Sequence, residues 1–164
     1  MHLDGIGIFD AVHVEVGFGA EKSWLEQWGL VERAYKRVQD LYAAGSVDNR
    51  EAQAVVKEFF IHSWHLSDWL RKDPSTSVRF EDIGTLVTSQ PDMRVCNAMA
   101  NTSKHFDLDG KMTARVSRVV VHPQCLVTIE ITRTTGSEER DALDLATSCM
   151  GIWRKFLHLH GLNP

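Results

Sequence analysis

The sequence has little cysteine and proline, only three and four residues among 164, and no long apolar run. Cys96, Cys125 and Cys149 are widely spaced and form no C-x-x-C pair, which argues against a disulfide framework and predicts reduced thiols that pack in a core. No segment is apolar over the length of a bilayer, and the N-terminal residues lack a signal-peptide pattern. We therefore expect a cytoplasmic protein with no membrane partner.

A strong charge of either sign is also missing. The chain carries 18 Lys and Arg residues against 22 Asp and Glu, a formal net charge of -4. This balance provides no global basic field, so a nucleic-acid site would have to be local. No Walker loop, G-x-G-x-x-G or G-x-S-x-G element is present, and we expect no cofactor. A hydrophobic content of 43% suits one domain over residues 1–164.

Hydrophobic periodicity predicts most of the chain to be helical. Apolar residues three and four apart place one face of a long helix toward a core, and Asp, Asn, Gly and Pro mark the ends of the segments. The helices expected from these signals span residues 20–44, 50–71, 80–88, 91–106 and 137–160.

Alternating apolar and polar residues predict a small sheet. Residues 113–121 and 126–134 alternate and are joined by H-P-Q-C, which indicates a β-hairpin, and residues 6–16 alternate as a possible third strand. The expected fold is mainly α, a four-helix-bundle-like α+β domain. It would carry a small antiparallel β-hairpin, or a three-stranded sheet, as an insertion at about residues 111–135.

The segment H-S-W-H-L-S-D-W-L places His62, His65 and Asp68 inside an otherwise apolar helix. Buried polar groups are costly unless they are paired or used. Two imidazoles and a carboxylate at these offsets suit a transition metal or a His-Asp acid-base couple. The spacing matches neither the H-E-x-x-H nor the E-x-x-H ligand pattern, and hydrogen bonds between packed helices would explain it equally.

A second polar stripe is expected on the helix at 91–106, formed by Arg94, Asn97, Asn101, Lys104 and His105. It offers donors, one titratable base and two cations to an anionic or carbonyl-bearing ligand. The alternative is an exposed face whose cations suit the negative pole of a helix end. If the two helices pack side by side, the two polar clusters converge.

The pairing of H-L-x-D-W at residues 65–69 with A-N-x-x-K-H at residues 100–105 resembles a family of small bacterial and phage proteins, from which no activity carries over. A helical bundle with an Asn and His stripe is also similar to the HEPN superfamily, whose members include metal-independent ribonucleases of toxin-antitoxin and phage-defence systems. That superfamily has an Arg separated from its His by four to six residues. The corresponding positions before His105 hold Ala98, Met99 and Ala100.

Three functions remain open from the sequence. The first is HEPN-like RNA cleavage, in which the substrate contacts are Arg94 and Asn97 and the catalytic residues are His65, Asp68, Asn101, Lys104 and His105. The second is a noncatalytic helical module that binds a partner protein. The third is a metal-dependent hydrolase that uses His62, His65, Asp68 and His105. The sequence also leaves a homodimer open, for which an exposed Trp28 would mark the face.

Overall fold

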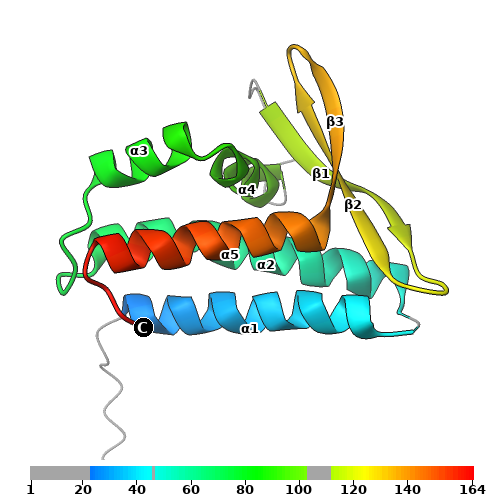
Figure 1. The fold of residues 1–164 in the computed structure, drawn as a ribbon, viewed down its shortest axis with the longest axis horizontal. Helices are drawn as coiled ribbons and strands as arrows, with labels where there is room; N and C mark the ends of the chain where they lie inside the picture. The colour runs from blue at the N-terminus through cyan, green and yellow to red at the C-terminus, as the bar shows by residue number, and fades with distance from the viewer. Residues whose placement is uncertain (1–22, 46, 103–111) are drawn as a thin grey trace, which may run out of the picture.

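A computed structural model describes residues 23–45, 47–102 and 112–164. The elements within these ranges are α1 (Trp24–Ala43), α2 (Asn49–Lys72), α3 (Phe80–Ser89), α4 (Pro91–Thr102), β1 (Met112–Val120), β2 (Leu126–Arg133), β3 (Gly136–Asp141) and α5 (Ala142–Leu159). The predicted strand at 6–16 lies outside them. The described part of the chain is mainly α with a small antiparallel sheet, which confirms the predicted α+β class (Figure 1).

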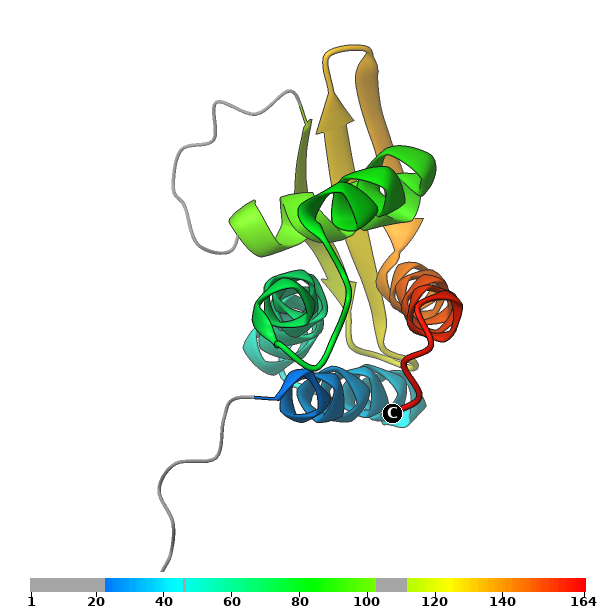
Figure 2. The same ribbon diagram turned by 90° about the vertical axis from the view of Figure 1, so that its left-hand side faces the viewer.

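Three helices, α1, α2 and α5, run side by side and form the centre of the helical part (Figure 1). Figure 2 looks along α2 and α5 and shows α1 below them and α3 and α4 above. The sheet stands at one end of this group, where β1 contacts α4 and β2 contacts α5. None of the described helices is long and apolar enough to cross a membrane.

Side-chain caps set the starts of the three long helices. Ser23, Asp48 and Asp141 each precede a helix in extended backbone and accept hydrogen bonds from N–H groups of its first turn. These N–H groups have no partner within the helix, so a cap stabilises the helix start by about 0.5–2 kcal/mol. The caps are local in sequence, which is why the predicted start of α2 lies within one residue of the observed start.

The sheet has strand order β1-β2-β3 with antiparallel pairing throughout. Its inner face is apolar, because Ala114, Val127, Ile129 and Ile131 are fully buried. Its outer face is polar and carries a salt bridge of 2.8 Å from Arg115 to Glu130 on the neighbouring strand. The alternation that predicted the hairpin therefore separates a core face from a solvent face.

The last helix begins later than predicted. Residues 137–141 contain good helix formers and were expected in the helix, but they belong to β3 and pair with β2 from Thr128↔Asp141 to Arg133↔Gly136. Gly136 adopts a φ of 137°, a conformation that favours glycine, directly after the two-residue turn. Pairing across the sheet thus overrides local helix propensity. Asp141, at the end of the strand, then caps α5.

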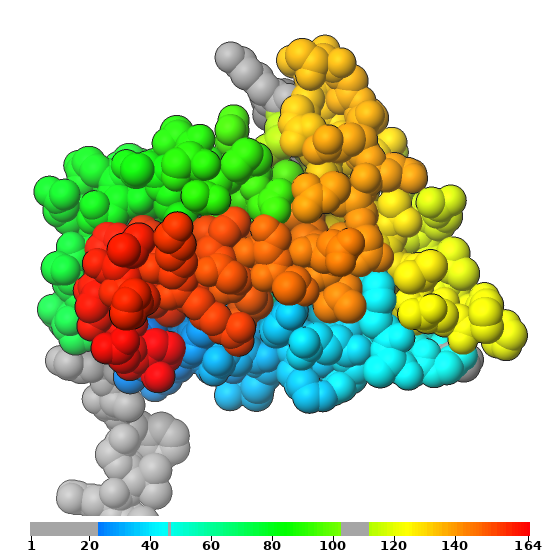
Figure 3. Space-filling model, viewed as in Figure 1, coloured from blue at the N-terminus to red at the C-terminus, as the bar shows by residue number. Residues whose placement is uncertain are grey.

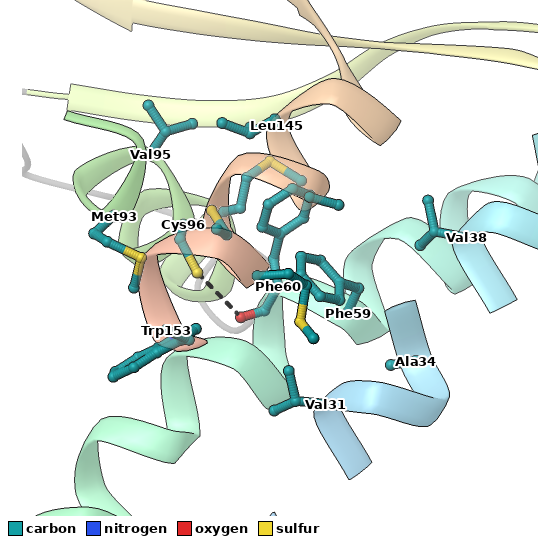
Figure 4. Close-up of a cluster of buried hydrophobic side chains, with 14 of the residues drawn as sticks. Val31, Ala34, Val38, Phe59, Phe60, Met93, Val95, Cys96, Leu145 and Trp153 are labelled. Carbon is teal, nitrogen blue, oxygen red and sulfur yellow. Dashed lines mark hydrogen bonds between the residues drawn. The ribbon is translucent and has the colours of Figure 1, made fainter. Parts of the chain in front are cut away.

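The core lies where α1, α2, α4 and α5 meet. Figure 4 shows Val31 of α1, Phe60 of α2, Cys96 of α4 and Trp153 of α5 gathered there, with the Cys96 thiol 3.8 Å from the Phe60 carbonyl oxygen. Ser63 adds a polar atom to this core, because the indole Nε1 of Trp153 donates to its Oγ at 3.0 Å. Both side chains are fully buried, so the bond satisfies a donor that water cannot reach.

The three cysteines are free and buried, as predicted. A hydrogen bond with Cys96, together with complete burial, raises the pKa of the Cys149 thiol well above its ordinary value and keeps it protonated. Trp28 is 3% exposed, so it does not provide the exposed tryptophan that would mark a dimer face, and the homodimer stays a prediction. Its side chain belongs to the face of α1 that packs into the core.

Candidate functional site

The C-terminal half of α2 forms one wall of a pocket of about 360 Å³. Its lining residues are His65, Asp68, Trp69, Lys72 and Asp73. The first four are three and four residues apart, and such positions lie on one face of a helix. The structure therefore brings two predicted catalytic residues, His65 and Asp68, into one pocket with an aromatic ring and an ammonium group.

Asp73 in this pocket has a structural task. Its carboxylate accepts hydrogen bonds from the backbone N–H of Trp24 at 2.8 Å and from the N–H and hydroxyl of Ser75 at 2.8 and 2.6 Å. These bonds, led by the one from the Ser75 hydroxyl, hold the pKa of Asp73 below its ordinary value. The ionised carboxylate thereby caps the N-terminus of α1 from 49 residues away and joins it to the end of α2.

The Asp68 carboxylate forms an ion pair with Arg71 on the next turn. The Asp68 side chain is 46% exposed and that of Arg71 29%, so this pair lies in contact with solvent. His65 and Trp69 are half-buried, and Lys72 is exposed. The pocket thus places an imidazole and a carboxylate where a ligand can reach them, with an indole ring beside them on which a planar ligand could stack.

His62, by contrast, does not line this pocket. It faces α1, where the buried Gln27 donates from Nε2 to the His62 carbonyl oxygen at 2.8 Å and lies 3.5 Å from its Nδ1. Its Nε2 is 3.9 Å from a carboxylate oxygen of Glu58. Within the described ranges, no group of three His, Cys, Asp or Glu side chains is placed to hold a metal ion. The described residues therefore give no support to the metal-dependent hydrolase.

The predicted stripe on α4 is divided. Asn101 donates from Nδ2 to Asn97 Oδ1 at 2.8 Å, and both side chains are half-buried. Arg94 is exposed and lines a separate pocket of about 420 Å³, together with Arg133. Lys104 and His105 lie outside the described residues. Convergence of His65 with the end of this stripe therefore stays a prediction.

Sequence reasoning missed that Trp69, Lys72 and Asp73 share the pocket with His65. The signal was present, because residues 65, 69 and 72 follow the four-and-three spacing of one helix face. The capping role of Asp73 could not be seen in the same way, since its partner Trp24 lies in a different helix.

Neither the scan against protein family models nor the searches of curated proteins and of solved structures finds a match for this chain. The class of the protein is therefore set by its fold and its site: a mainly α, α+β domain with a polar pocket on a central helix.

Proposed function

We propose that this protein is a metal-independent ribonuclease whose reacting centre includes the pocket on α2. The observation that carries the proposal is the position of His65 and Asp68 in one pocket beside Trp69. Histidine is the side chain whose ordinary pKa, about 6.5, suits proton transfer in both directions at neutral pH. An indole ring offers a stacking surface to a nucleobase, which every base can use.

In this reaction a base takes the proton of a ribose 2′-hydroxyl, the 2′-oxygen attacks the adjacent phosphorus, and the bond from phosphorus to the 5′-oxygen breaks. An acid returns a proton to the departing 5′-oxygen, so the products are a 2′,3′-cyclic phosphate and a free 5′-hydroxyl. In this proposal the base and the acid are His65 and His105, the latter placed in the site by the sequence prediction alone. Lys72 supplies a positive charge at the pocket, and Lys104 is proposed to stabilise charge on the phosphodiester. Arg94, which lines a separate pocket, is proposed to contact the RNA away from the reacting centre.

The second candidate is a noncatalytic helical module that binds a partner protein. The observation that favours it is that several polar side chains on these helices already serve packing. Asn97 and Asn101 bond to each other, and His62 is held by Gln27 between α1 and α2. In such a module His65 would contribute to stability or to partner binding, without chemistry of its own.

The test is cleavage of a labelled RNA oligonucleotide pool by the purified full chain in EDTA, with wild type, His65→Gln and His62→Gln compared. The two histidines are three residues apart on the same helix, and only His65 lines the pocket. We expect cyclic-phosphate ends from wild type and from His62→Gln. His65→Gln should lose about 100-fold or more of the rate while melting within a few degrees of wild type.

Three results would count against the nuclease. If the wild-type protein leaves every RNA intact, the nuclease proposal is refuted. If His65→Gln and His62→Gln cleave RNA equally well, His65 takes no part in the reaction. A large loss of thermal stability in His65→Gln, with no cleavage by wild type, would favour the noncatalytic module.

A further inference from the structure

A groove of about 530 Å³ runs between α3 and α5. The side chains of these two helices adjoin on the face of the molecule shown in Figure 3. Its apolar surface comes from Leu86 of α3 and from Ile152, Phe156 and Leu159 of α5. Leu159 is 70% exposed, which is unusual for a leucine beside other apolar side chains. The volume falls within the range of small-molecule sites, about 300–1,000 Å³. None of its lining residues belongs to the His65 pocket.

Among the described residues that line the groove, one cation, Lys155, has no carboxylate partner and can meet a ligand. The Asp82 carboxylate accepts a hydrogen bond from the Arg79 backbone N–H at 2.8 Å and lies 3.5 Å from the Arg79 guanidinium, so its charge is matched by the residue that precedes α3. The His160 ring stacks on Phe156, with 4.1 Å between ring centroids. Lys155, which also lines the groove, makes no ion pair with any carboxylate among the described residues.

Gly151 keeps the groove open on the side of α5. A Cβ built on this residue would meet no atom within 4 Å, and its backbone does not have the positive φ that favours glycine. Glycine is the poorest helix former after proline, and neither the helix geometry nor a neighbouring atom requires it here. The consequence of this glycine is space at the middle of the groove, between the small Ser148 and the charged Lys155.

We propose that this groove binds a small amphiphile, a medium-chain carboxylate whose carboxylate meets Lys155. Its hydrocarbon chain lies on Ile152 and Leu159, above a floor formed by the buried Leu86 and Phe156. The apolar side chains favour a hydrocarbon because its binding removes the apolar surface of the ligand and that of the groove from water. The unmatched ammonium favours an anionic head over a neutral one. A protein partner fits less well, because a stable protein interface buries about 800 Å² on each side and this groove offers four apolar side chains.

The test measures binding of octanoate and of octanol to the full chain by isothermal titration calorimetry. Gly151→Phe fills the groove, and its control is Gly84→Phe, a helical glycine that also has no atom within 4 Å of a built Cβ but lines a different pocket. Lys155→Met removes the ammonium and keeps the stem. Its control is Arg154→Met, which removes the neighbouring exposed cation outside the groove.

We expect octanoate to bind wild type and Gly84→Phe alike and to bind Gly151→Phe at least about tenfold more weakly. Lys155→Met should reduce the preference for octanoate over octanol by about threefold, and Arg154→Met should leave it unchanged. Thermal melts of each variant establish that it is folded.

No octanoate binding to wild type would overturn the proposal, as would equal binding by the two phenylalanine variants. If octanol binds as tightly as octanoate, the inference that the ligand has an anionic head group is wrong. Self-association of wild type that Gly151→Phe abolishes would assign the groove to a second copy of the chain instead. The nuclease proposal is untouched by each of these results, because the two sites share no lining residue.

Discussion

Replacing Ser63 by alanine is expected to destabilise the protein although the change removes a single oxygen atom. The Ser63 hydroxyl accepts the hydrogen bond from the Trp153 indole at 3.0 Å, and the Cys96 thiol lies 3.4 Å from the same oxygen. All three side chains are fully buried, so no water reaches the indole N–H once the hydroxyl is gone. The cost is that of a buried donor without a partner.

The magnitude follows from two opposing contributions. A buried neutral donor without an acceptor costs about 1–3 kcal/mol, and alanine returns about 0.5 kcal/mol because it is the better helix former. The net loss of unfolding free energy is then roughly 0.5–2.5 kcal/mol, or about 1–10 °C in Tm for a domain of this size. The five tryptophans of the chain together provide a fluorescence signal for unfolding of the whole domain.

Ser67→Ala is the matched control, since it lies one turn later on α2 and is 3% exposed. Its hydroxyl donates only to the Trp64 carbonyl oxygen of its own helix, at 2.7 Å, and its loss leaves no buried donor behind. Urea unfolding of the two variants should show a lower midpoint for Ser63→Ala and a change within about 0.5 kcal/mol for Ser67→Ala. Equal stabilities of the two variants would refute the reasoning.

Three further changes test other parts of the fold. Tyr42→Phe removes a hydroxyl whose pKa is raised by burial and by Asp141, to which it donates a hydrogen bond at 2.9 Å. We expect urea unfolding to show a loss of about 1–3 kcal/mol of unfolding free energy. An unchanged free energy would show that water replaces the hydrogen bond to Asp141. Asp73→Asn should make Tm decrease less steeply as the pH is lowered. The depressed pKa of Asp73 stabilises the folded protein above about pH 3.9, and this stabilisation is lost as the pH falls through the pKa of the folded state. If Tm depends on acidic pH in the same way in Asp73→Asn and in wild type, Asp73 does not cap α1. Gly151→Ala should raise unfolding free energy by about 0.5–1 kcal/mol, and a decrease would mean that the groove does not tolerate a methyl group.

The helices were predictable where their signals are local. Residues 50–71 were expected to be helical and α2 spans Asn49–Lys72, because the cap, the apolar periodicity and the stop before Pro74 lie within the segment itself. The same holds for α3, expected at 80–88 and found at Phe80–Ser89. The start of α5 was mispredicted because local propensity favours a helix over residues 137–141, whereas the preceding strand β2 pairs with their backbone across a two-residue turn.

The candidate site was predictable only in part. Periodicity placed His62 and His65 on neighbouring positions of one helix, but which way each of them faces depends on what packs beside it. Gln27 of α1 takes up His62, whereas His65 reaches a pocket. The α2 segment alone does not distinguish these two environments, since both histidines lie within one apolar stretch of the same helix.

The sequence by itself determined the fold class, the reduced state of the buried thiols and the position of most helices, because these follow from composition, periodicity and caps within short segments. Only the tertiary structure decided that Asp73 caps a helix 49 residues earlier in the chain, that residues 136–141 become a strand, and that α3 and α5 leave a groove beside Gly151. The helix cap and the groove each join segments that are distant in sequence, and the strand at 136–141 depends on pairing with the preceding strand β2. In all three cases contacts between elements decide the structure, and the pattern within any one segment does not.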